Sequence, residues 1–105
     1  MIRVSLLRDA EGRVSGFACK GHAGYAEEGS DIVCAAVSVL SITCANALQS
    51  VAGAEPEITE KDGFLTASLR EDQLSHDSQV ILRTFEQGIC DMAASYPKYI
   101  SFTAR

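Results

Sequence analysis

The stretch "DIVCAAVSVLSITCANALQSVAGA", residues 31–54, decides the fold, because it carries no charged residue after Asp31. Asp31 is a typical N-cap, and Gly53 followed by Pro56 ends the pattern, so we expect a helix from Asp31 to about Val51. One apolar face follows the helical spacing of three and four residues: Val33, Val37, Leu40, Cys44, Ala47 and Val51. A second face carries Ile32, Ala36, Val39 and Thr43.

A helix that is apolar on most sides is usually buried on most sides. In a chain of 105 residues this indicates that one face of the helix meets a second subunit. The stretch is also long enough to span a membrane, but six polar residues would be costly in hydrocarbon: Ser38, Ser41, Thr43, Asn46, Gln49 and Ser50. We therefore expect a buried helix and no contact with a membrane.

Length and composition predict one globular domain over residues 1–105, since 47% of the residues are apolar and 22% are charged. The net charge is −5, and the nine Lys and Arg residues are scattered. This excludes nucleic acid as the main partner, because such binding needs clustered positive charge. The N-terminus lacks the pattern of a signal peptide, so we expect a cytoplasmic protein with free thiols.

The remaining segments predict an α+β fold. Residues 2–8 and 14–20 form one predicted hairpin, and residues 56–61 and 64–70 form a second around Asp62-Gly63. A second helix spans 76–95, and its predicted core face is Ile81, Leu82, Phe85, Ile89 and Met92. Pro97 ends this helix, and residues 98–105 close as a strand. The order β-β-α-β-β-α-β predicts a mostly antiparallel sheet packed with two helices.

Cys34 is the residue whose position favours chemistry. A thiol attacks as its thiolate, and the positive end of a helix stabilises that anion. With Asp31 as N-cap, Cys34 is the third helical residue, and the loop before it is long enough to bring His22 over the helix start. An imidazole there would hold the thiolate and later protonate a leaving amine. Backbone N–H groups at the helix start would form an oxyanion hole.

The residues alone leave a second interpretation of Cys34 open, because free cysteine is among the most buried residue types. We interpret Cys19, Cys44 and Cys90 as packing residues and His76 as solvated. Ser38 lies one turn after Cys34, and its hydroxyl is expected to bond a carbonyl of its own helix.

A zinc site starting from Cys19 and His22 finds no further ligands in the sequence. Cys34 and Cys44 lie about 15 Å apart along one helix, so they cannot bind one ion. We predict no metal and no cofactor.

The motif "GHAGYAEEGSDIVCAAVS", residues 21–38, resembles the signature of the ribosomal-processing cysteine proteases, the Prp family. Its pattern is Gly-His-Ala, a glycine-containing loop, then Gly-x-Asp, two hydrophobic residues and Cys-Ala-x-x-Ser. The chain length, the element order and "YPKYI" at 96–100 also match. The resemblance implies a cysteine endopeptidase that removes the N-terminal extension of ribosomal large-subunit protein twenty-seven, after a hydrophobic motif containing Phe. It implies Cys34 as nucleophile, His22 as base, Asp31 and Ser38 as supporting residues, and a homodimer.

Gly21, Gly24 and Gly29 predict that residues 21–30 form a mobile loop that closes over the substrate. Glu27 and Glu28 in this loop are predicted to attract basic residues near the cut, or else to be only solvated. Two other functions remain open: a ribosome-associated binding module with a packed thiol, and a thiol redox sensor. The sensor lacks a CxxC pair, and no resolving cysteine lies near Cys34 in the sequence.

Overall fold

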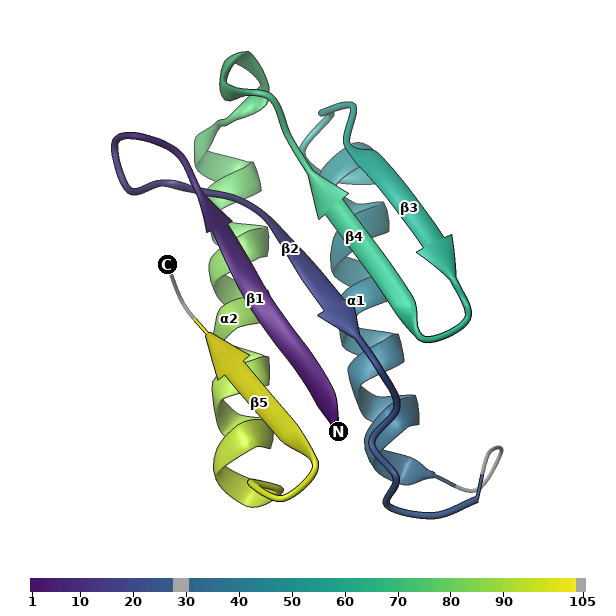
Figure 1. Cartoon of the computed structure of the whole chain (residues 1–105). Helices are drawn as coiled ribbons and strands as arrows, with labels where there is room; N and C mark the ends of the chain where they lie inside the picture. The colour runs from purple at the N-terminus through teal and green to yellow at the C-terminus, as the bar shows by residue number, and fades with distance from the viewer. Residues whose placement is uncertain (28–30, 104–105) are drawn as a thin grey trace.

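The structure is a computed structural model that describes residues 1–27 and 31–103. In chain order its elements are β1 (Ile2–Arg8), β2 (Val14–Lys20), α1 (Ile32–Ser50), β3 (Glu57–Lys61), β4 (Phe64–Ser68), a 3₁₀ turn (Glu71–Gln73), α2 (His76–Ser95) and β5 (Ile100–Thr103). Figure 1 shows both helices on one face of the sheet. The predicted α+β class and element order are confirmed. The last strand starts at Ile100, and residues 104–105 of the predicted strand lie outside the described residues.

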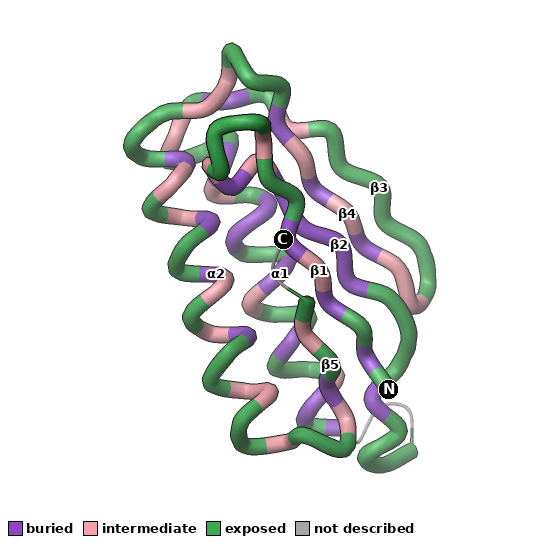
Figure 2. The backbone as a smooth tube through the Cα atoms, turned by 60° about the vertical axis from the view of Figure 1, so that its left-hand side comes forward, coloured by how far each residue is buried: buried purple, intermediate pink, exposed green. Residues whose placement is uncertain are grey.

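The strands form one sheet in the order β3-β4-β2-β1-β5. Three neighbouring pairs are antiparallel, and the β1–β5 pair is parallel. β1 and β2 lie inside the sheet, and the chain runs from the end of β2 towards the start of α1 (Figure 1). β3 forms one edge, and all five of its residues are exposed, as Figure 2 shows.

The core lies between the sheet and the two helices. Phe17 in β2 stacks on Phe85 in α2 with ring centroids 4.0 Å apart, which joins the middle of the sheet to that helix. Leu82, Phe85 and Ile89 are fully buried, as predicted for the core face of α2. Ile81 and Met92, predicted on the same face, are only half-buried.

The predicted core face of α1 is partly wrong. The buried residues of this helix are Val33, Val37, Ser41, Cys44, Ala45 and Leu48. Leu40 and Ala47 are half-buried, and Val51 follows the last turn as C-cap with 67% of its surface exposed. The face of α1 that contacts the core is thus rotated about the helix axis toward Ser41 and Leu48, by about half of the ~100° that separates successive residues. Because apolar residues lie on both sides of α1, the sequence pattern does not show which side meets the sheet.

The opposite side of α1 is open in the single chain. Ile32 is 56% exposed and Val39 is 67% exposed, and Ala36 and Thr43 on the same face are also exposed. Within the described residues, α1 is the one helix long and apolar enough to cross a membrane by length and composition. Its other face supplies Val33, Val37 and Leu48 to the core, as the central helix of a folded domain does.

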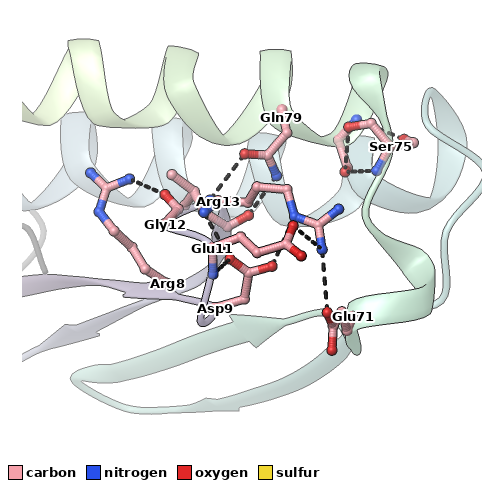
Figure 3. Close-up of polar contacts among 10 residues, drawn as sticks. Arg8, Asp9, Glu11, Gly12, Arg13, Glu71, Ser75 and Gln79 are labelled. Atoms are coloured by element: carbon pink, nitrogen blue, oxygen red, sulfur yellow. Dashed lines mark hydrogen bonds and ion pairs between the residues drawn. The ribbon is translucent and has the colours of Figure 1, made fainter.

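The end of the sheet away from Cys34 is fixed by polar contacts, shown in Figure 3. Asp9 accepts hydrogen bonds from the backbone N–H of Arg13 at 2.8 Å and from its Nε at 2.8 Å, which closes the β1–β2 turn. Gln79 of α2 pairs with the backbone of Val14: it accepts from the N–H at 3.0 Å and donates to the carbonyl at 2.7 Å. These contacts hold α2 against β2.

Candidate active site

Asp31 places Cys34 in the first turn of α1. Its carboxylate oxygen Oδ1 accepts hydrogen bonds from the N–H of Val33 at 3.0 Å and of Cys34 at 2.9 Å. The predicted N-cap is therefore confirmed, and Cys34 is the third residue of the helix. Its side chain is half-buried, whereas Cys19 and Cys44 are buried.

The loop after β2 returns to the start of α1, as predicted. Gly21 makes this return possible, since its φ is +92° and a Cβ there would lie 2.5 Å from the carbonyl oxygen of Met1. Two residues further on, the backbone N–H of Ala23 donates a hydrogen bond to Cys34 Sγ at 3.1 Å. His22 lies directly before this donor, and it lines the same cavity as Cys34. The Cys34 sulfur thus faces a backbone donor from the loop that carries His22.

Asp31 also anchors the described part of the loop. Its second oxygen, Oδ2, accepts from the N–H of Tyr25 at 3.0 Å and of Ala26 at 3.3 Å. Burial by itself would raise the pKa of Asp31, but the backbone hydrogen bonds of Cys34, Ala26 and Tyr25 outweigh it and keep that pKa below its usual value. The ionised carboxylate thus joins the loop to the helix. No hydrogen bond between Asp31 and His22 is present among the described residues.

The two tyrosines of the "YPKYI" segment hold the same loop from the other side. The ring of Tyr25 contacts Tyr96 edge-on at 6.0 Å and Tyr99 at 5.1 Å between centroids. Gly24 has a φ of +71°, which lets the chain turn just before Tyr25. Glu27 is exposed, and the predictions for Glu28 and Gly29 lie outside the described residues.

The oxyanion hole at the helix start stays a prediction, since three of the N–H groups there have partners in this structure. The N–H groups of Val33 and Cys34 donate to the Asp31 side chain, and that of Ala35 donates to the Asp31 carbonyl at 3.0 Å. These donors are already used. Ala23 supplies the backbone N–H that faces the sulfur.

Two cavities meet at Cys34. The larger, of about 520 Å³, lies between α1 and the β3–β4 hairpin. The other, of about 370 Å³, lies beside the loop at Gly24, Ala26 and Asp31. His22, Cys34 and Ser38 line both cavities. The larger cavity also has apolar walls, formed by Ile2, Val37, Ile42, Phe64 and Leu65.

Ser38 is exposed and faces both cavities. The expected bond from its hydroxyl to a helix carbonyl is absent from the described contacts. Ser41, three residues later and buried, donates such a bond to the carbonyl of Val37 at 2.7 Å. The Ser38 hydroxyl is therefore available to a bound peptide.

Asp62 and Gly63, which the sequence predicts only as a hairpin turn, lie beside His22. His22 Nε2 lies 3.7 Å from Asp62 Oδ1. A Cβ at Gly63 would lie 2.9 Å from the same Nε2. The backbone N–H of Gly21 donates to the Gly63 carbonyl at 2.8 Å. The hairpin signal located this turn, but no local pattern shows that its tip meets His22, 40 residues earlier in the chain.

The other three cysteines differ from Cys34. Burial raises the pKa of the Cys19 thiol to about 12, against a hydrogen bond with Ser41 that acts in the opposite direction. Burial also raises the pKa of Cys44. Packing is confirmed for these two, but the prediction for Cys90 is wrong, since this residue is exposed on the outer side of α2. Within the described ranges, no three His, Cys, Asp or Glu side chains gather as metal ligands.

The comparison with protein families shows the family of the chain. A family model described as "Cysteine protease Prp" matches residues 1–101. The chain belongs to the Prp family of cysteine proteases. The resemblance seen in the 21–38 motif is thereby confirmed. A Prp-family chain with a half-buried, N–H-bonded cysteine at a helix start is an enzyme of the cysteine protease class.

Two curated relatives carry the name "Ribosomal processing cysteine protease Prp". The one from Staphylococcus aureus (strain Mu50 / ATCC 700699) is 33% identical over 85 residues, which is 80% of each chain. The one from Bacillus subtilis (strain 168) is 36% identical over 66 residues, which is 61% of this chain and 59% of that protein.

Solved Prp structures share the fold. The S. aureus protease in complex with a covalently linked product peptide superposes with a TM-score of 0.92, at 27% identity and full coverage of both chains. The same protease with a substrate peptide gives a TM-score of 0.86 at 26% identity, again over both full chains.

Proposed function

We propose that this chain is an endopeptidase that removes the N-terminal extension of ribosomal large-subunit protein twenty-seven. Cys34 is the nucleophile and His22 is its acid–base partner. The observation that carries this assignment is the position of Cys34: it is half-buried, receives the Ala23 N–H at 3.1 Å, and opens with His22 onto two cavities. The reported activity of ribosomal processing belongs to the named relatives.

The catalytic steps follow from these positions. The Cys34 thiolate, supported by the Ala23 N–H and the start of α1, attacks the scissile carbonyl carbon. The C–N bond breaks as protonated His22 gives its proton to the leaving amine, and the peptide remains on Cys34 as a thioester. Water then gives a proton to neutral His22 as its oxygen attacks the thioester carbonyl carbon. The C–S bond breaks, the cleaved segment leaves as a carboxylic acid, and the Cys34 thiolate and protonated His22 are restored. A covalently linked product peptide in the S. aureus relative agrees with such a step.

The two cavities suggest how a peptide lies. In an extended peptide that crosses Cys34, the residues before and after the scissile bond would lie in different cavities. Ser38 lies where the two cavities meet. The larger cavity has the apolar walls that a hydrophobic, Phe-containing motif needs. We therefore place the residues before the cut between α1 and the β3–β4 hairpin.

This placement has a matched test. Ile42 lines the larger cavity and is 40% exposed, while Ile58 is 43% exposed and lies outside the residues lining it. Ile42→Ser should raise KM for the precursor about tenfold, since one apolar contact in a pocket is worth about 1–3 kcal/mol. Ile58→Ser should leave KM unchanged. Equal KM values for the two variants would place the hydrophobic motif elsewhere.

The activity itself is tested by incubating the purified chain with the extended ribosomal protein and sequencing the new N-terminus. Cys34→Ala and His22→Ala should abolish cleavage. Cys90→Ala is the matched control, because Cys90 is exposed and lies outside both cavities lined by Cys34. Cleavage by Cys34→Ala would leave the non-enzymatic binding module as the better account.

A homodimer is part of the proposal. The support is the uncharged outer face of α1, where Ile32 and Val39 are more than half exposed. Large apolar side chains gathered on one surface are typical of an interface. Sedimentation should give a dimer for the wild type and a monomer for Val39→Glu. The four free cysteines fit a reducing compartment such as the cytoplasm.

A further inference from the structure

The ring of His22 is held by the tip of the β3–β4 hairpin. The distances from the Cβ position of Gly63 are 2.9 Å to Nε2, 3.4 Å to Cδ2 and 3.5 Å to Cε1. Nε2 is therefore the ring atom directed at the hairpin, with its two neighbours equally far behind it. The other nitrogen, Nδ1, is not among the ring atoms nearest to the hairpin.

Asp62 supplies the charge at this contact. Its Oδ1 lies 3.7 Å from Nε2, an ion-pair distance once the imidazole is protonated. The other charged side chains around the larger cavity are Glu60 and Lys61 of the same hairpin, and the cavity also holds the thiols of Cys19 and Cys34. Asp62 is the carboxylate paired with His22 in the described part of the chain.

The hairpin tip is fixed relative to the loop that carries His22. The N–H of Gly21, next to His22, donates to the carbonyl of Gly63, next to Asp62, at 2.8 Å. Both partners of the ion pair are thus one residue away from the same backbone hydrogen bond. A carboxylate on one nitrogen of a histidine sets the tautomer and orientation of the other nitrogen.

We propose that Asp62 is a positioning residue, which holds Nε2 of His22 so that Nδ1 serves Cys34. The proposal rests on the proposed function in taking His22 and Cys34 as catalytic partners. It adds a third residue, supplied by the β3–β4 hairpin rather than by the signature motif. Asp62 acts on the reaction through His22, by pairing with the imidazolium that accompanies the thiolate during the reaction.

The test compares Asp62→Asn with Glu60→Gln. Asn keeps the turn, because Asn and Asp both favour turn positions, and it removes only the charge. Glu60→Gln removes the same charge from the same hairpin and the same cavity, without a contact to His22 among the described ion pairs. Asp62→Glu restores the carboxylate and should recover most of the lost rate.

Two readouts separate this proposal from the proposed function. The first is the alkylation rate of Cys34 by iodoacetamide at about pH 6, which needs no substrate. Asp62→Asn should lower it about two- to fivefold, the range for an exposed ion pair, and the loss should shrink in high salt. The second is cleavage of the precursor, where kcat should fall by the same factor with KM unchanged.

A double-mutant cycle gives the decisive outcome. In the His22→Ala background, Asp62→Asn should cause no further loss of alkylation rate, because the carboxylate acts through the ring. An additive loss, or an equal loss in Glu60→Gln, would overturn the proposal as a general charge effect. If the wild type failed to cut the precursor while the cycle held, the substrate assignment alone would fall.

Discussion

Gly63 is the position where one methyl group tests the geometry of the site. It has a φ of +69°, and a Cβ there would lie 2.9 Å from Nε2 of His22. Ordinary contacts between such atoms need about 3.5–4.0 Å, so Gly63→Ala displaces the imidazole by about 0.6–1 Å. A misplacement of about 1 Å at a reacting group can cost about 100-fold in rate. We expect kcat/KM for the precursor to fall about 10- to 100-fold.

The control removes the effect of backbone strain. Gly12 in the β1–β2 turn has a φ of +83°, and nothing lies within 4 Å of its Cβ position. Alanine in this backbone region costs about 1–2 kcal/mol at either site. Urea denaturation should therefore show similar losses of stability for Gly63→Ala and Gly12→Ala, while only Gly63→Ala loses activity.

The assay follows peptide cleavage at substrate concentrations spanning KM, with the folded fraction of each variant checked first. Wild-type kcat/KM in Gly63→Ala would show that the His22 ring does not need its place against the hairpin. Equal activity losses in both variants would show that only stability matters. Either result refutes the geometry described for His22.

Three further results are expected. The Asp31 pKa is lowered in the folded state, so the ionised cap contributes stability above pH 3.8, the usual pKa, and loses it as the pH falls through the lower pKa of the folded state. The difference in unfolding free energy between wild type and Asp31→Asn should therefore shrink on acidification. A difference that stays constant with pH would contradict this. Cys34 should react with an alkylating reagent at about pH 6 while Cys19, whose pKa is raised to about 12, stays unmodified in peptide maps; modification of Cys19 first would be the contrary result. Gln79→Met should lower stability by about 1–3 kcal/mol in denaturation, because it removes both bonds to Val14; an unchanged midpoint would show that these bonds contribute nothing.

Most elements of the fold could be predicted from short-range sequence patterns. Asp31 caps the first helix because its carboxylate reaches the N–H groups of Val33 and Cys34, a contact set by three neighbouring positions. The Asp62-Gly63 turn likewise depends on Gly63 adopting a positive φ. Such features need no knowledge of distant segments, and they were predicted correctly.

Features that depend on tertiary contacts were missed. The face of α1 that meets the core includes Ser41 and Leu48 instead of Val51, since both sides of this helix are apolar and the packing of the sheet makes the choice. Cys90 follows the buried Ile89 in sequence, but points to the outside of α2. The contact between His22 and Asp62 joins segments 40 residues apart, and no periodicity reports it.

The described part of the glycine loop, residues 21–27, is held by contacts at two places. It is tied to α1 through Asp31 and to the C-terminal segment through Tyr25. If the loop closes over a substrate, it must either break these contacts or move together with the segments that it contacts. Closure of the loop remains a prediction, which hydrogen exchange at Tyr25 and Ala26 with and without substrate would test.

The central claim is that the sulfur of Cys34 carries the peptide during cleavage. The most direct measurement is acid quenching of the enzyme with the extended ribosomal protein in the first turnover, followed by peptide mapping by mass spectrometry. We predict a thioester on Cys34 that adds the mass of the removed N-terminal segment less one water, and that is absent in Cys34→Ala. Cleavage that proceeds with no adduct on Cys34, or that continues in Cys34→Ala, would contradict the account.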